Sequence, residues 1–262
     1  MHARTAVIVQ ARFSSTRLPG KVLESLAGHT VLEHVLHRCG AIASADVVCC
    51  AVPANRDSDA VARAAEQLGV VVYRGDEHDV LDRYYRAAQA VDAEVVMRVT
   101  SDCPLIDPGI CDAVLQLRAQ LGADYACNNM PRSGPHGLDC EAFTFTALRR
   151  AAHEATDAHS REHVTPWLRS HPQLIRCNLA GDTAGGGLRW TLDYPEDLAF
   201  FRALFALLPP WPAIPSSREV LRLLAGHPEI AAINSHLAEG SAGQRPTPIA
   251  ASDDPHRDFE GP

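Results

Sequence analysis

Three features that mark other classes of protein are missing from this 262-residue sequence. It contains no run of about 18 apolar residues that could cross a bilayer, and its first residues lack the apolar stretch and cleavage site of a secretory signal. A basic excess is absent as well, because 24 Lys and Arg residues face 32 Asp and Glu residues, for a formal net charge of −8. We therefore expect a cytoplasmic protein that binds neither membranes nor nucleic acid and that holds any anionic ligand through a local basic cluster.

The eight cysteines include no Cys-x-x-Cys pair. Most of them lie in apolar segments, where a thiol behaves as a small hydrophobic side chain. With 46% apolar and 21% charged residues, the chain can also build a substantial core. The cysteines are therefore predicted to be reduced core residues, and only Cys103 stands out, because it follows an acidic residue in a predicted loop.

Short apolar segments alternate with amphipathic ones through the first 130 residues. This alternation is typical of β-α-β units, and right-handed crossovers between them build a doubly wound, mainly parallel sheet with helices on both faces. The expected strands are 6–10, 47–52, 70–73 and 94–99, and the expected helices end before Gly40, Gly69 and Gly122. Asp107 is predicted to be the N-cap of the third helix, ahead of Pro108.

The pattern changes after residue 125. Alternation over 138–145 predicts an edge or antiparallel strand, followed by helices near 146–155 and 161–170, strands near 175–178 and 188–192, and a helix at 195–208. We expect one domain over 1–237, in which 125–170 is an excursion from the parallel core. The small, polar and Pro-rich segment 238–262 is predicted to be a disordered tail.

The strongest chemical signal is the segment 10–21, QARFSSTRLPGK, directly after the first strand. Ligands of open α/β sheets bind beyond the carboxyl ends of the strands, so this loop is well placed. It combines Arg12, Arg17 and Lys21 with hydroxyl groups such as that of Ser14, a composition that suits a polyphosphate. A solvated basic loop is the plainer alternative.

Two familiar phosphate-binding motifs do not fit this loop. A P-loop requires glycine where Ser15 stands and Ser or Thr where Val22 stands, and the dinucleotide fingerprint requires three spaced glycines. The predicted phosphate site is therefore of another kind.

Two aspartates follow predicted strands and are candidate ligands for a divalent cation. Asp102 lies in RVTSDCPLID and Asp193 in RWTLDYPED. Mg2+ prefers one or two carboxylates together with phosphate oxygens, so the pair predicts a Mg2+ site beside the basic loop. Asp193 has the alternative of a helix N-cap, and Glu196 and Asp197 are interpreted as first-turn acids, which the helix dipole favours.

Six motifs in this order give the chain its resemblance to a known family. The chain resembles the SpsF-like branch of cytidylyltransferases, which are relatives of CMP-Kdo synthetase and acylneuraminate cytidylyltransferase. The motifs that carry the resemblance are ARFSSTRLPGKVL, YRGDEHDVLDRYY, RVTSDCPLID, GLDCEAF, REHVTP and LRWTLDYPEDL. The likeness runs from about residue 5 to 235. It implies a three-layer α/β/α nucleotide-diphosphosugar-transferase (Rossmann-like) fold, transfer of CMP from CTP to an acidic sugar with Mg2+, and a homodimer formed near 130–170.

The resemblance also implies roles for individual residues. Arg12, Arg17 and Lys21 match the basic loop that grips the triphosphate, and Asp102 and Asp193 match the metal-binding pair. The Ala11 backbone and Thr100 match positions near the cytosine, with Ser14 and Arg74 as further nucleotide contacts. The chain departs from the Kdo enzymes in having Thr100-Ser-Asp-Cys-Pro104 where they have Gln-Gly-Asp-Glu-Pro.

The remaining polar motifs are assigned to the acidic acceptor. His136, Asp139 and Glu141 surround a Gly137 turn and are expected to hydrogen-bond sugar hydroxyls, with a plain charged hairpin as the alternative. Arg161 and His163 are candidates for an acceptor carboxylate or the leaving phosphate. A structural role is the alternative for four residues, Arg74, Arg83, Tyr84 and Tyr85. For the two tyrosines this role is packing of a helix against the core.

Other functions fit fewer residues. A phosphonate or sugar phosphate is an alternative acceptor. His159-Ser-Arg-Glu-His163 matches the H-x-x-E-H pattern of inverted zinc peptidases, but no third ligand follows at helical spacing. A regulatory protein that binds nucleotide without turnover would have no need of both strand-end aspartates.

Overall fold

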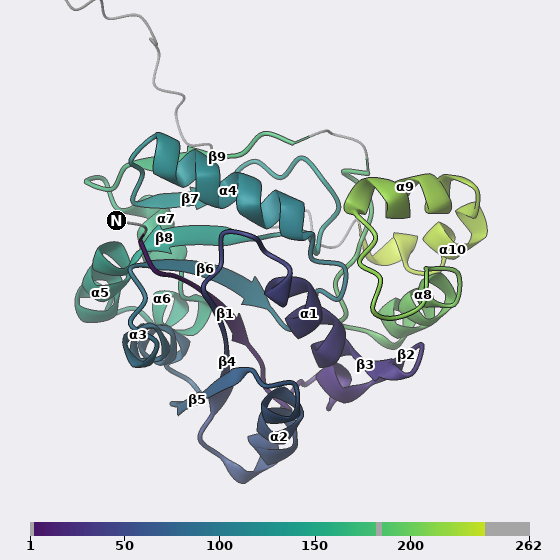
Figure 1. Ribbon diagram of the computed structural model, residues 1–262, viewed down its shortest axis with the longest axis horizontal. Helices are drawn as coiled ribbons and strands as arrows, with labels where there is room; N and C mark the ends of the chain where they lie inside the picture. The colour runs from purple at the N-terminus through teal and green to yellow at the C-terminus, as the bar shows by residue number, and fades with distance from the viewer. Residues whose placement is uncertain (1–2, 182–184, 239–262) are drawn as a thin grey trace, which may run out of the picture.

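The computed structural model of this protein describes residues 3–181 and 185–238. Its centre is a seven-stranded sheet with the strand order β5-β4-β1-β6-β8-β7-β9 (Figure 1). Neighbouring strands are parallel except at β8, which runs against both β6 and β7. The strands are Thr5–Gln10 (β1), Val47–Pro53 (β4), Val71–Gly75 (β5), Val95–Thr100 (β6), Tyr125–Cys127 (β7), Glu141–Thr144 (β8) and Arg176–Asn178 (β9). The predicted mainly parallel sheet with a small antiparallel excursion is confirmed.

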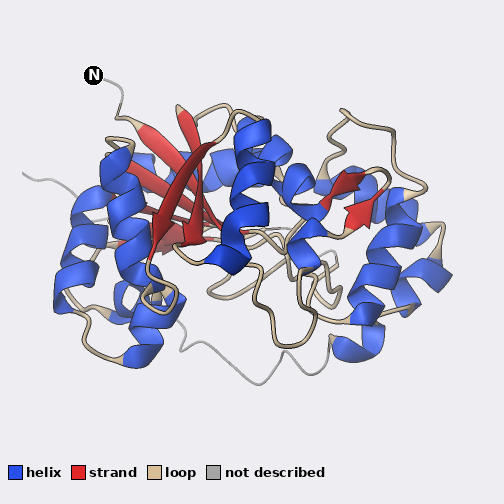
Figure 2. Ribbon diagram, turned by 90° about the horizontal axis from the view of Figure 1, so that it is seen from below, coloured by secondary structure: helices blue, strands red, loops and turns tan. Residues whose placement is uncertain are grey.

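Helices cover both faces of this sheet, as Figure 2 shows. One face packs against α1 (Val31–Gly40), α2 (Asp59–Gln67) and α4 (Pro108–Gln120). The other packs against α3 (Val80–Ala90), α5 (Phe145–Glu154), α6 (Ala158–His163) and α7 (Pro166–Ser170). Successive residues of β1 serve the two faces in turn, because strand side chains alternate, and this produces the three layers.

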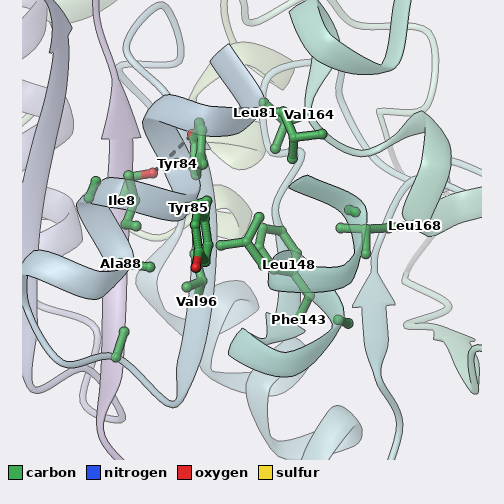
Figure 3. Packing of buried hydrophobic residues seen from close by; sticks show 14 of the residues in the cluster. Ile8, Leu81, Tyr84, Tyr85, Ala88, Val96, Phe143, Leu148, Val164 and Leu168 are labelled. Atoms are coloured by element: carbon green, nitrogen blue, oxygen red, sulfur yellow. Dashed lines mark hydrogen bonds between the residues drawn. The ribbon is translucent and has the colours of Figure 1, made fainter. Parts of the chain in front are cut away.

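The core under α3 confirms the packing role predicted for its two tyrosines (Figure 3). Tyr84 is completely buried, and its hydroxyl donates to the carbonyl oxygen of Ile8 at 3.2 Å. Tyr85 stacks on Phe145 of α5, with ring centroids 5.7 Å apart. All eight cysteines are free, and seven of them are buried, in agreement with the expected reduced core residues.

A third apolar cluster lies at one end of the sheet, around the buried Trp190 (Figure 1). It joins α8 (Pro195–Phe205), α9 (Ser217–Ala225) and α10 (Pro228–Ala232) to a short ribbon of β2 (Ser25–Leu26) and β3 (His29–Thr30). The remaining elements are short 3-10 helices: η1 (Lys21–Leu23), η2 (Arg56–Ser58) and η3 (Ser235–Leu237). Burial of Trp190 and Leu192 holds the chain before Asp193 against this cluster.

Two predicted elements are wrong in detail. The strand expected at 188–192 is extended chain with a single isolated bridge between His136 and Arg189, because its side chains pack into the third cluster instead of a sheet ladder. The helix expected at 161–170 is divided into α6 and α7, since Val164 adopts a φ of 71° and Pro166 follows. The predicted tail lies outside the described residues except for Ala238. No helix within the described ranges is long and apolar enough to cross a membrane.

Asp107 is the N-cap of α4, as predicted. Its Oδ1 accepts from the backbone N–H groups of Gly109 (2.9 Å) and Ile110 (3.3 Å), and its Oδ2 accepts from Ser217 N–H (2.7 Å). We expect Asp107→Ala to lower the free energy of unfolding by about 1–2 kcal/mol, because the cap and the link to α9 are lost together. Urea unfolding measures this effect, with exposed Glu66→Ala as the control, and an unchanged midpoint would contradict the assignment.

Candidate active site

The basic loop after β1 ends on a buried lysine. Gly20 has a φ of 74°, the left-handed conformation that glycine tolerates best, and Lys21 then opens η1. The Lys21 Nζ donates to Asp102 Oδ2 (2.9 Å), Asp193 Oδ1 (2.9 Å) and the carbonyl oxygen of Leu192 (2.7 Å). All three ammonium donors therefore have acceptors.

This geometry brings together the loop and the two aspartates that the sequence predicts as metal ligands. Burial alone would raise the pKa of Asp102, but the Lys21 ammonium lowers it to about 2, so the carboxylate is ionised at neutral pH. Burial likewise works against the charge of Lys21, and the two carboxylates overcome it and raise its pKa. The three side chains form a charged centre that combines one cation and two anions.

Arg17 joins the same centre from the solvent side. Its Nη2 donates to Asp193 Oδ1 (3.0 Å) and its Nη1 to the Tyr194 hydroxyl (3.2 Å). The Arg17 side chain is 51% exposed, so it can turn toward a ligand. The N-cap of α8 is Tyr194, which means that the N-cap alternative for Asp193 is wrong.

A buried group behind Asp193 orients it, and sequence reasoning missed most of this group. Arg189 donates from Nε (2.9 Å) and Nη2 (3.0 Å) to the fully buried Asp197, and from Nη2 to Asp193 Oδ2 (2.8 Å). Asp197 also accepts from Asn234 Nδ2 (2.9 Å) and from the backbone N–H of Tyr194 (3.0 Å). Asp197 was expected only as a first-turn acid, because its partners Arg189 and Asn234 lie on either side of it in sequence and give no local pattern.

The first half of the loop is tied to the segment between β5 and α3. Ser14 Oγ donates to Glu77 Oε1 (3.1 Å), and Glu77 Oε2 accepts from Asn55 Nδ2 (2.7 Å). Ala11 is buried and its N–H donates to the carbonyl oxygen of Ala51 at 3.2 Å. Arg12 is exposed and forms no hydrogen bond or ion pair within the described part of the chain, so its guanidinium remains available.

Thr100 lies at the carboxyl end of β6, opposite Gln10 in the register with β1. Its hydroxyl lies 3.3 Å from the Sγ of Cys103. Burial raises the pKa of the Cys103 thiol well above its ordinary value, and the nearby Asp102 adds to the effect. Cys103 is therefore a neutral thiol beside the charged centre.

The structure corrects the role expected for Glu141. Its carboxylate is 2% exposed and binds Arg98 and Arg169, the latter with a 2.6 Å contact from Nη2, together with the Tyr125 hydroxyl. Burial would raise the pKa of Glu141, but Arg169 and Arg98 lower it to about 2. Glu141 is thus the centre of a buried ion cluster and has no free oxygen for an acceptor.

Two arginines assigned to ligands are also occupied by the protein. Arg161 binds Asp79 through Nε (3.0 Å) and Nη2, and its Nη1 donates to the carbonyl oxygen of Ala152 (2.6 Å). It therefore ties α6 to the N-cap of α3. Arg74 Nη1 binds Asp59 at 2.7 Å on the edge strand β5, which gives it a structural partner.

The other predicted acceptor residues differ in availability. Asp139 accepts from Arg132 Nε (2.9 Å) and Nη2 (3.1 Å), whereas His136 Nε2 lies 3.7 Å from Asp139 Oδ2. Burial lowers the pKa of His136, and its Nδ1 has no hydrogen-bond partner among the described residues. His163 contacts His159, with ring centroids 4.6 Å apart. Burial, and then the neighbouring His159, lower its pKa.

The zinc-peptidase alternative gains no support from this geometry. His159 and His163 do meet on α6, but the helix has only six residues. Across 3–181 and 185–238, no group of three or more His, Cys, Asp and Glu side chains is arranged to hold a metal ion.

Comparisons with known proteins agree with the fold and the motifs. Residues 6–196 match the family model described as cytidylyltransferase. The spore coat polysaccharide biosynthesis protein SpsF of Bacillus subtilis is 31% identical over 232 residues, which cover 86% of this chain and 95% of that protein.

Two of the solved structures that resemble the chain illustrate the range of similarity. A cytidylyltransferase from Leptospira borgpetersenii serovar Hardjo-bovis superposes with a TM-score of 0.82 at 26% identity, covering 88% of this chain and 97% of the other. CMP:2-keto-3-deoxy-manno-octonic acid synthetase complexed with CTP gives a TM-score of 0.59 at 16% identity, over 78% and 99% of the two chains, and supports the fold alone. Fold, motif order and family match agree, and this chain belongs to the cytidylyltransferase family.

Proposed function

We propose that this enzyme transfers CMP from CTP to an acidic sugar of the nonulosonate or Kdo type and releases pyrophosphate. The observation that carries the proposal is the junction of Lys21, Asp102 and Asp193, which lies at the end of a loop whose Arg12 has no hydrogen-bond or ion-pair partner in the described chain. The SpsF relative is named for polysaccharide biosynthesis, and one structure with this fold is a synthetase complexed with CTP. A place in nucleotide-sugar biosynthesis fits both.

The triphosphate is assigned to the loop 12–21. Arg12 has no hydrogen-bond or ion-pair partner within the described chain, and the half-exposed Arg17 can turn away from Asp193 and Tyr194. Guanidinium groups bind phosphate oxygens with two parallel hydrogen bonds, which positions the chain of phosphates as well as neutralising it. Lys21 adds a charge at the inner end of the loop.

The residues present fit a divalent cation. Asp102 and Asp193 place two carboxylates around a single positive centre, now the Lys21 ammonium, and oxygen donors of this kind suit Mg2+. We assign Asp102 and Asp193 as its protein ligands. Bound Mg2+ would supply neutralisation of charge on the phosphate oxygens. Arg189 would keep Asp193 oriented through its 2.8 Å hydrogen bond.

The reaction needs positioning more than covalent chemistry by the protein. A hydroxyl oxygen of the acceptor forms a bond to the α-phosphorus and loses its proton to solvent. The bond from that phosphorus to the bridging oxygen breaks, and pyrophosphate leaves with the bonding electron pair. The chain contributes by aligning the two substrates and by neutralising charge with Arg12, Arg17 and Lys21. His136 and His163 remain the candidates for contact with the acceptor.

A screen for pyrophosphate release tests this function. Purified protein with Mg2+ is given each of the four ribonucleoside triphosphates together with nonulosonic acids, Kdo, sugar phosphates and phosphonates. We expect release with CTP and an acidic sugar. Turnover with a phosphonate or a sugar phosphate alone would replace the proposed acceptor, and no release with CTP and any acceptor would contradict the proposal. Light scattering on the same protein tests the proposed homodimer formed through the 125–170 region.

Arg12→Ala should raise the KM for CTP about tenfold, because one charge-assisted contact to the triphosphate is lost. Since Arg12 is exposed and unpaired in the described chain, the free energy of unfolding should stay the same. Steady-state kinetics and urea unfolding measure the two quantities. The matched control is Arg86→Ala, which also removes an exposed arginine, in this case one on α3. An unchanged KM would remove Arg12 from the site.

A further inference from the structure

A cavity of about 250 Å³ lies between α1 and the segment that follows α8. It belongs to neither the charged centre around Lys21 nor the loop 12–21. Its walls are mostly apolar and include Phe205, Leu208, Trp211 and Pro215. Pockets for drug-sized ligands measure roughly 300–1,000 Å³, so this cavity suits a small molecule and is too small for a nucleotide.

The cavity contains one buried cation. Arg38 of α1 lines it and is only 4% exposed. Its Nη1 donates to the carbonyl oxygens of Ile106 (3.3 Å) and Pro215 (3.1 Å), but its Nε and Nη2 have no hydrogen-bond partner among the described residues. No carboxylate of the described chain forms an ion pair with it. Buried arginines usually form an ion pair with a carboxylate. Burial of this arginine without one therefore lowers the stability of the fold.

The nearest acid does not supply the missing partner. Asp107 acts on Arg38 through space, but both of its oxygens are committed to backbone N–H groups, those of α4 and Ser217. Burial lowers the pKa of Arg38 to about 10, so the group still carries its charge at neutral pH.

The two histidines that line the cavity are both bonded to backbone carbonyl oxygens. His34 Nε2 bonds to the carbonyl oxygen of Leu26 and His37 Nε2 to that of Pro212, both at 2.9 Å. Because a carbonyl only accepts, each Nε2 carries a proton, which leaves Nδ1 as an acceptor wherever the ring is neutral. Burial lowers the pKa of His34 and favours this neutral form.

From this arrangement we infer that the cavity is a binding site for a small organic monocarboxylate, separate from the active site. The carboxylate receives hydrogen bonds from the free Nε and Nη2 of Arg38, the parallel pair of donors that a guanidinium offers. The hydrocarbon body lies against Phe205, Leu208 and Trp211. A single unpaired positive charge in apolar walls matches a monoanion with an apolar body better than a phosphate, which carries more charge and needs more donors.

Benzoate is a suitable probe, with benzamide as its neutral equivalent of the same shape and inorganic phosphate as the plain anion. We expect isothermal titration of the full-length protein to give a dissociation constant for benzoate on the order of a millimolar. Benzamide and phosphate should bind at least tenfold more weakly, and saturating CTP should not displace benzoate. Equal binding of benzamide, tighter binding of phosphate, or displacement by CTP would each overturn the inference.

Two variants locate the binding. Arg38→Met keeps an unbranched apolar stem and should weaken benzoate at least tenfold. Ala213→Leu enlarges one of the residues that line the cavity, leaves Arg38 in place, and should weaken benzoate and benzamide alike. If Arg38→Met fails to fold, Ala213→Leu still decides the question. Unchanged benzoate binding in a folded form of either variant would show that the ligand does not occupy this cavity.

Discussion

Exchanging Asp102 for asparagine should slow the release of pyrophosphate from CTP by about 10³-fold, while the protein still folds. The change removes one of the two carboxylates assigned to Mg2+, and losses of this size follow removal of a single group that stabilises charge in the transition state. Folding should be preserved because Lys21 keeps Asp193 and the Leu192 carbonyl as acceptors. Steady-state turnover and urea unfolding together measure the prediction.

Asp59→Asn is the matched control, since it removes an aspartate that pairs with Arg74 on the surface. It should leave turnover unchanged and cost at most about 1 kcal/mol of stability. A second readout separates a metal role from a structural one. If Asp102 helps to hold Mg2+, the Mg2+ concentration needed for half-maximal activity should rise in Asp102→Asn, whereas near-normal turnover at ordinary Mg2+ would end the assignment.

Replacing Glu141 by glutamine should lower the free energy of unfolding by about 3 kcal/mol. Glutamine keeps the shape but leaves Arg98 and Arg169 without their buried anion, and loss of one partner from a buried pair costs about 3–5 kcal/mol. Urea unfolding measures the loss. Glu154→Gln, which breaks the exposed pair with Arg150, should cost far less. A stable Glu141→Gln enzyme with a raised KM for the acceptor would restore the role that the sequence alone suggested.

The same carboxylate gives the stability a pH dependence. Folding lowers the pKa of Glu141 from its ordinary 4.5 to about 2, because the two arginines outweigh the effect of burial. The stability contributed by the ionised group is therefore fully present above about pH 4.5 and is lost as the pH falls toward 2. The difference in unfolding free energy between the wild type and Glu141→Gln should shrink across this range. A constant difference would mean that the carboxylate does not titrate within the cluster.

Local patterns predicted much of the fold. Short apolar runs in β1 and β6 and helical spacing in α1 and α4 are properties of neighbouring residues, so they are visible in the sequence. The N-cap at Asp107 followed from one acid before one proline. The extended chain at 188–192 shows the limit of this reasoning. Its apolar residues look like a strand, but they pack against α8 instead of pairing with another strand.

For the candidate site, too, some features could be predicted from local sequence and others could not. Segment 10–21 and Asp102 could be predicted, because the carboxyl ends of the neighbouring parallel strands β1 and β6 meet at one sheet edge. Asp193 was also predicted, but packing of its segment against α8 brings it to the site, since 188–192 is not a strand of the sheet. The partners of Glu141 and Arg161 could not, since Arg169 and Asp79 are distant in sequence and no local spacing relates them.

The amino-acid sequence by itself determined the sheet, the basic loop and the two aspartates that lie near it, because those depend on side-chain periodicity and on the order of strands. Only the tertiary structure decided which charged side chains are unpaired and which form ion pairs with one another. Arg12 is unpaired in the described chain while Glu141 is buried among arginines, although both are single charged residues close to a strand. The reason is that the ionisation and availability of a charge depend on burial and on distant partners, which only packing brings within a few ångströms.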